Sequence, residues 1–268
     1  MDRDVDHQAA PTVPGDTVVT SRRKIAIVPW HPALAVLYLV LIFFVSQIVG
    51  GILASLYATA MYGSSANISD LINNSTSLQF GYILVVEAVA VGGIFAFLKW
   101  FKTSLKAIGL RRPKWSDLGY GLLALPAYYI IFYVAVIVIK LLSPGLDVNQ
   151  EQAVGFNDVS GALPLILTFV SLVVLPPFAE EIMVRGYLYT SLRKKLSIVV
   201  AGLISSALFA AAHLAGAASG GLLWIAAIDT FTLALTLVYL RERTGGLWAC
   251  MTLHAAKNSV AFYLLFIH

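Results

Sequence analysis

Long apolar stretches separated by short polar segments make up most of the sequence after residue 25. About seven of these stretches are long enough to cross the roughly 30 Å hydrocarbon core of a bilayer as a helix. They cover about residues 33–62, 78–98, 118–142, 163–189, 199–217, 221–240 and 247–267. The pattern predicts an all-α fold, a polytopic membrane helix bundle of about seven transmembrane helices, in a multi-pass protein of the cell membrane.

Positively charged residues fall in alternate polar segments, which indicates an orientation. They occur in segments 22–24, 99–114, 193–195 and 241–243, whereas segments 63–77, 143–162 and 214–220 contain no lysine or arginine. Because cytoplasmic loops are enriched in lysine and arginine, the amino terminus is predicted to be cytoplasmic. Residues 1–24 are polar and are expected to form a disordered cytoplasmic tail, and residues 25–268 a single transmembrane domain.

Composition agrees with this class of protein. Hydrophobic residues make up 59% of the chain and charged residues 12%, against roughly a quarter charged in ordinary soluble domains. The net charge of +4 is explained by membrane orientation, so we expect lipid around the chain and no nucleic acid as a partner. Cys250 is the only cysteine, which excludes an intramolecular disulfide and a cysteine metal cluster.

Glu180, Glu181 and Arg185 stand directly behind the apolar run from Leu163 to Leu175. Charged groups at bilayer depth are costly and commonly mark a functional site. On a helix Glu181 and Arg185 are four residues apart and can pair, which leaves Glu180 free and gives Arg185 a structural role. The alternative is a solvated helix end at the membrane interface.

Two further polar placements lie inside apolar sequence, at His213 and at the pair His254 and Asn258. A lone histidine in an apolar helix is more often a packing residue, but His254 and Asn258 share one helix face. With Glu180 they could activate a water molecule and stabilise an oxyanion. Glu180, His213 and His254 could instead hold Zn²⁺, although the H-E-x-x-H signature is absent. A metal-free mechanism is favoured because a glutamate with histidine partners can activate water unaided.

These residues form three motifs whose order and spacing resemble those of the CAAX prenyl protease and bacteriocin-processing (Abi) family. The motifs are E-E-x-x-x-R at Glu180, Glu181 and Arg185, F-x-x-x-H at Phe209 and His213, and H-x-x-x-N at His254 and Asn258, within about residues 160–260. The resemblance implies an intramembrane endopeptidase that acts on a membrane-associated or lipid-modified protein or peptide, including a prenylated one. It assigns water activation to Glu180 and His213 and oxyanion support to His254 and Asn258.

Two other functions remain open from the sequence. Some members of the family are immunity or scaffold proteins, so the chain could be a non-catalytic binding protein on the same scaffold. A proton-coupled carrier that uses Glu87, Glu180 and Asp229 as relay groups is the second alternative.

Residue counting gives two expectations about depth in the membrane. Straight spans would leave His213 far from Glu180, so we expect the helix at 197–217 to start below the surface or tilt, and Pro176-Pro177 to break the fourth span. Lys257 and Asp229 fall at similar depths on helices joined by a short turn. They are predicted to form an ion pair, with Glu87 as the second choice of partner.

Overall fold

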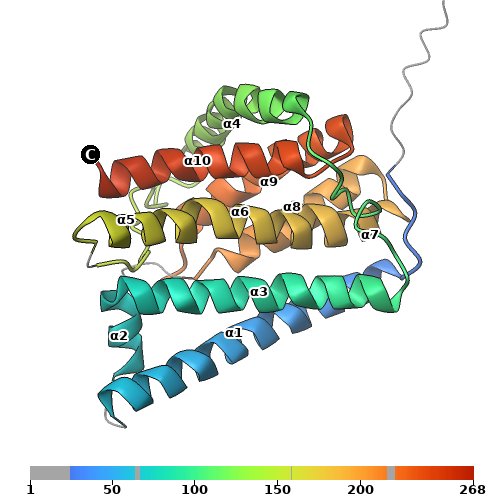
Figure 1. Cartoon of the computed structure of the whole chain (residues 1–268). Helices are drawn as coiled ribbons and strands as arrows, with labels where there is room; N and C mark the ends of the chain where they lie inside the picture. The colour runs from blue at the N-terminus through green and yellow to red at the C-terminus, as the bar shows by residue number, and fades with distance from the viewer. Residues whose placement is uncertain (1–24, 64–66, 158, 216–220) are drawn as a thin grey trace, which may run out of the picture.

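A computed structural model describes residues 25–63, 67–157, 159–215 and 221–268 (Figure 1). The described residues form eight helices, one of which contains two π-helical segments. The separate helices are α1 Pro32–Tyr62, α2 Ile68–Asn74, α3 Thr76–Trp100, α4 Trp115–Leu142, α8 Ile198–Ala212, α9 Trp224–Thr244 and α10 Trp248–Phe266. The long helix comprises α5 Ala162–Phe169, η1 Val170–Val174, α6 Leu175–Glu180, η2 Glu181–Leu188 and α7 Tyr189–Arg193. The predicted all-α class is confirmed for this part of the chain.

Five helices are long and apolar enough to cross a membrane: α1, α3, α4, the long helix Ala162–Arg193 and α9. Helix α8 has 15 residues and is therefore about 22 Å long, which is less than the bilayer core. Helix α10, with 19 residues, carries His254, Lys257 and Asn258 and is not among the five. The count of seven spans and the orientation stay predictions, and the predicted disordered tail at 1–24 lies outside the described residues.

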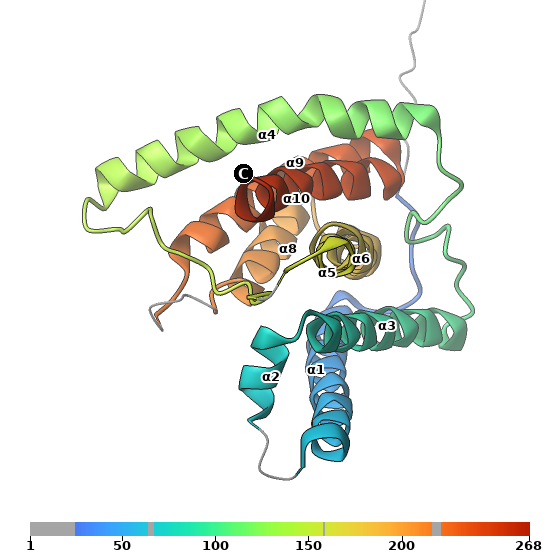
Figure 2. The ribbon, with the colours of Figure 1, turned by 60° about the vertical axis from the view of Figure 1, so that its left-hand side comes forward.

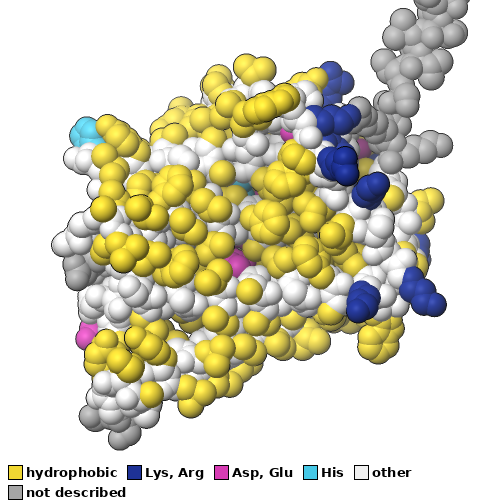
Figure 3. Space-filling view, viewed as in Figure 1, with side chains coloured by type: hydrophobic (Ala, Val, Ile, Leu, Met, Phe, Trp, Pro, Cys, Tyr) yellow, Lys and Arg dark blue, Asp and Glu magenta, His cyan; other side chains and the backbone are white. Residues whose placement is uncertain are grey.

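The long helix lies at the centre of the molecule. Figure 2 views it end on, between the pair α1 and α3 on one side and the helices α4, α8, α9 and α10 on the other. The space-filling view shows a face dominated by hydrophobic side chains, with lysine and arginine gathered at the end where α3 stops and α4 begins (Figure 3). Short α2, which packs on α1 and α3, lies in a segment that the sequence predicted to be a loop.

The long helix continues through Pro176 and Pro177, so the predicted break there is wrong. In an α turn the carbonyl of Leu172 would accept from the N–H of residue 176, and in a π turn from that of residue 177. Both residues are prolines and have no N–H, so this carbonyl has no backbone donor. The Nδ2 group of Asn258, on α10, donates to this carbonyl at 2.9 Å. The turn before the prolines widens to π geometry, in which the N–H of Leu175 bonds to the carbonyl of Val170. A side chain from another helix thus allows the backbone to remain helical.

Polar contacts also fix the C-terminal part of the long helix against its neighbours. The indole Nε1 of Trp30, just before α1, donates to Ser191 Oγ at 2.5 Å, and Trp30 is 2% exposed. Arg241, which the sequence suggested was a cytoplasmic loop charge, is equally buried. Its guanidinium donates to the backbone oxygen of Arg185 at 3.3 Å and to Thr190 Oγ1 at 3.2 Å. These bonds connect the long helix to α1 and α9.

Candidate active site

Glu181 begins the second π-helical segment and is fully buried. Its Oε1 accepts a hydrogen bond from Arg185 Nη1 at 3.2 Å, which confirms the predicted pair. The same oxygen lies 3.1 Å from Nδ1 of His254 on α10. Because a carboxylate only accepts hydrogen bonds, Nδ1 of His254 carries the hydrogen. Glu181 therefore fixes both the ring orientation and the hydrogen position of His254.

Glu180 is the last residue of α6 and points differently from Glu181. Its Oε2 lies 3.8 Å from Nε2 of His254, and its side chain is 20% exposed. Oε2 itself is buried and has no hydrogen-bond partner among the described residues. The structure therefore brings Glu180 and His254 together, with one buried oxygen of Glu180 facing Nε2 of His254.

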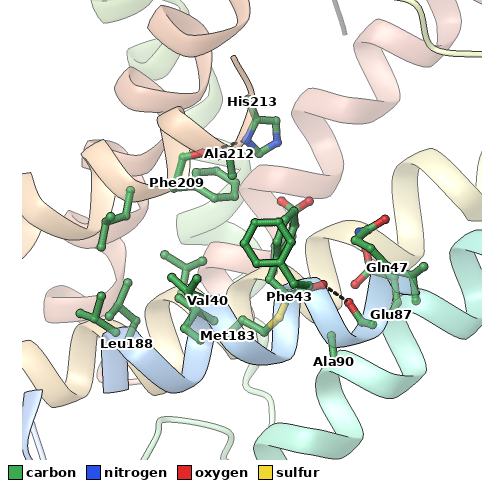
Figure 4. Close-up of a pocket in the computed structure, with 18 residues that line it drawn as sticks. Val40, Phe43, Gln47, Glu87, Ala90, Met183, Leu188, Phe209, Ala212 and His213 are labelled. Carbon is green, nitrogen blue, oxygen red and sulfur yellow. Dashed lines mark hydrogen bonds between the residues drawn. The ribbon is translucent and has the colours of Figure 1, made fainter. Parts of the chain in front are cut away.

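His213 occupies the C-terminal cap of α8, because the helix ends five residues before the predicted boundary at 217. Its Nδ1 lies 2.9 Å from the carbonyl of Phe209. A carbonyl cannot donate, so Nδ1 carries the hydrogen and Nε2 of the neutral ring keeps a lone pair. His213 and Glu180 line one cavity of about 300 Å³ (Figure 4).

Phe209 packs among the charged and imidazole groups of the site. The guanidinium carbon of Arg185 lies 4.5 Å from the centre of its ring. The rings of His213 and His254 approach it edge to face, with centroids at 4.7 Å and 6.2 Å. Phe209 is 5% exposed. It lines the cavity of Glu180 and His213 and supports Arg185 through a cation–π contact.

Asn258 lies one turn beyond His254 on α10 and faces the long helix. Its bond to the carbonyl of Leu172 uses one of the two N–H groups of the amide. The residue is partly exposed. Asn258 thus has a structural role, and neither Asn258 nor His254 is among the residues that line the cavity of Glu180 and His213.

A metal centre does not form from the proposed ligands. Within the described ranges, no three His, Cys, Asp or Glu side chains are placed so that they could hold a metal ion. Among the described residues, Glu180, His213 and His254 are therefore not arranged as a zinc site. We assign no chemical step to a metal.

A second polar cluster lies away from this site, between α4, α9 and α10. Lys257 Nζ contacts Asp229 Oδ2 at 2.6 Å, which confirms the predicted ion pair. The hydroxyl of Tyr128 donates to the other oxygen of Asp229. These residues line a separate cavity of about 280 Å³. Because Glu87 and Glu180 line the first cavity, the three acids suggested for a carrier do not lie in one place.

Glu87 and Gln47 are site residues that the sequence motifs do not include. Both line the cavity that holds Glu180 and His213. Glu87 could be noticed in the sequence as an acid inside an apolar stretch, but there it is interpreted as a relay group of a carrier or as a partner of Lys257. Gln47, on α1, gave no signal, since its position depends on how α1 packs against α3.

Part of the chain is similar in sequence to known proteins. A family model described as "Rce1-like: Type II CAAX prenyl endopeptidase Rce1-like" matches residues 162–260. A curated relative, the UPF0177 protein YxdF of Lactococcus lactis subsp. lactis (strain IL1403), is 31% identical over 116 residues, which is 43% of this chain. The matched part spans 60% of the length of that relative. No solved structure matches the chain.

Proposed function

We propose that the protein is an intramembrane endopeptidase, because residues 162–260 match the model of the Rce1-like type II CAAX prenyl endopeptidases. Its substrate would be a membrane-associated or lipid-modified protein or peptide. The observation that carries the proposal is the convergence of Glu180 with two histidines from different helices. Nε2 of His254 lies 3.8 Å from Glu180, and His213 lines the same cavity as Glu180.

In the proposed reaction Glu180 is the general base. Its carboxylate takes a proton from water as the water oxygen attacks the scissile carbonyl carbon. The lone pair on Nε2 of His213 accepts the second hydrogen of that water and orients it. When the tetrahedral intermediate collapses, the carbon–nitrogen bond breaks and Glu180 returns the proton to the leaving amine. Glu180 ends the cycle as a carboxylate, so the step balances.

His254 and Asn258 are assigned to the developing oxyanion. Nε2 of His254, when it carries a proton, would donate to the oxyanion together with the second N–H of Asn258. The bond from Nδ1 to Glu181 holds the imidazole in place, and Arg185 holds Glu181. Glu181 and Arg185 are therefore positioning residues that do not contact the substrate.

The proposed setting is a multi-pass membrane protein with a cytoplasmic amino terminus. In that orientation α8 begins at the cytoplasmic side, and at about 22 Å it is too short to reach the opposite surface. His213 would then lie inside the bilayer, at a depth that Glu180 can share. The depth conflict found by residue counting is thus relieved by the early end of α8.

Purified full-length protein in detergent micelles, supplied with a fluorescence-quenched, farnesylated CAAX peptide, tests the proposal. Glu180→Gln preserves shape and removes the base, so we expect it to lower turnover by about 10²–10⁴-fold. His213→Ala and His254→Ala should show losses of similar size. Glu151→Gln changes an exposed loop acid and serves as the control. Undiminished turnover in Glu180→Gln would remove the proposed mechanism.

A binding or immunity function on the same scaffold makes the opposite forecast. In cells, a phenotype that depends on the protein should then persist in Glu180→Gln, because this change leaves the binding surface intact. The same variant used as a bait would retain an uncleaved substrate if the protein is a protease. Identifying that protein by cross-linking and mass spectrometry would define the substrate class.

A further inference from the structure

The cavity that holds Glu180 has a second polar region, contributed by helices outside the matched residues 162–260. Glu87 comes from α3 and Gln47 from α1. Figure 4 shows their side chains together at one end of the cavity, with Leu188 at the opposite end. The rest of the lining is mostly apolar. A ligand in this cavity therefore meets the reactive groups of the domain on one wall and this pair on another.

Glu87 has no structural partner that would account for it. Among the described residues, no hydrogen bond or ion pair involves its carboxylate, and the residues that line the cavity include no lysine or arginine. Lys257, for which Glu87 is the second predicted partner, is instead paired with Asp229 in the other cavity. Acids at membrane depth are costly, so an unpaired one in a cavity points to a ligand that supplies hydrogen-bond donors.

Gln47 supplies the complementary group. The hydroxyl of Tyr82 donates to Gln47 Oε1 at 2.5 Å, which fixes the amide. The carbonyl side of the amide is thereby engaged, and its NH₂ group is left as a donor. A carboxylate acceptor and an amide donor side by side match the N–H and C=O groups of an extended peptide.

We propose that Glu87 and Gln47 bind the backbone of the peptide substrate, in a role that rests on the proposed function. The Glu87 carboxylate accepts a hydrogen bond from a substrate N–H, and the Gln47 amide donates to a substrate carbonyl. The pair holds the peptide in the cavity beside Glu180 and His213. It makes the α1 and α3 helices part of the substrate-binding site.

The test is a binding measurement that does not need turnover. A fluorescein-labelled, farnesylated CAAX peptide is titrated with full-length Glu180→Gln protein in micelles and followed by fluorescence anisotropy. A panel of the same peptide replaces each backbone amide in turn by an ester, which removes one N–H. One ester should weaken binding by about tenfold, the usual size for loss of one charge-assisted hydrogen bond.

Adding Glu87→Ala should weaken binding of the parent peptide by about the same factor and abolish the further effect of that ester. Gln47→Ala should weaken the parent peptide too, and Glu151→Ala should change nothing. Additive losses, full affinity in Glu87→Ala, or no binding of the peptide to the Glu180→Gln protein would each overturn the inference. A melting curve of each variant shows whether it is folded.

Cleavage of the same peptide separates this inference from the proposed function. If the peptide binds with the expected dependence on Glu87 but the unmodified protein does not cut it, the endopeptidase proposal fails and the binding site stands. If the protein cuts the peptide and Glu87→Ala leaves KM unchanged, the endopeptidase proposal stands and the binding site is rejected.

Discussion

Two polar clusters inside the same helix bundle differ in how completely their charges are matched. Between α4, α9 and α10, Lys257 pairs with Asp229, whose other oxygen accepts from Tyr128. Between the long helix, α8 and α10, Glu181 is held by Arg185 and His254, but Oε2 of its neighbour Glu180 has no hydrogen-bond partner in the described part of the chain. We infer that the matched cluster holds helices together, and that the unmatched carboxylate is kept for a reactant.

Breaking the matched cluster should have the largest effect on stability. Asp229→Leu or Lys257→Leu strands the opposite charge, so each should lower the free energy of unfolding by about 3–5 kcal/mol. The double change should recover most of this loss, because no charge is left unpaired. Denaturant unfolding in micelles, followed by tryptophan fluorescence, gives the four values of the cycle.

The matched comparison is Glu180→Leu, which removes a carboxylate whose one ion-pair partner among the described residues is the nearby His254. Its free energy of unfolding should stay at or above that of the unmodified protein. If the two losses at Asp229 and Lys257 simply add, or if Glu180→Leu destabilises as they do, the division between the two clusters is not supported.

A smaller loss is expected for Asn258→Leu. This change removes the donor to the carbonyl of Leu172, and a buried carbonyl left without a partner costs about 1–3 kcal/mol. Ser259→Ala, at the next position of α10, is the control, since the Ser259 hydroxyl bonds only within its own helix. If both variants have the melting temperature of the unmodified protein, the Leu172 carbonyl has found another hydrogen-bond donor.

Phe209→Leu should have the smallest effect of the three. The change keeps an apolar side chain and removes the ring under Arg185, a cation–π contact of about 0.5–2 kcal/mol. Phe178→Leu on α6 is a suitable control because Phe178 is 40% exposed. If Phe209→Leu and Phe178→Leu have the same melting temperature, the cation–π contact of Phe209 with Arg185 adds no stability.

The features that follow local rules could be predicted from the sequence. The apolar stretches gave the positions of the membrane-length helices, and i, i+4 spacing gave the pair of Glu181 with Arg185. Depth counting on two antiparallel helices gave Asp229 with Lys257, because the turn at 245–247 leaves little freedom in their relative position. The motifs identified Glu180 and His254, which the structure brings together.

Features that depend on contacts between distant helices could not be predicted. A proline pair normally interrupts a helix, whereas here the amide of Asn258, 86 residues away in the chain, donates to the Leu172 carbonyl that the prolines leave without a donor. Gln47 enters the cavity because α1 and α3 pack closely at Gly50. A Cβ on residue 50 would overlap the side chain of Val86, so the glycine lets Val86 and Tyr82 approach α1. The early end of α8 at His213 had no marker in an apolar sequence.

The bond between Asn258 and Leu172 also bears on the order in which the protein is assembled. The long helix is synthesised well before α10, so the Leu172 carbonyl enters the membrane without its donor, at a cost that lipid cannot offset. His254 reaches Glu181 only with the same late helix. A nascent chain in which α10 has not yet packed against the long helix should therefore hold a strained long helix and an incomplete candidate site, so the proposed activity would depend on a contact made only after α10 is synthesised.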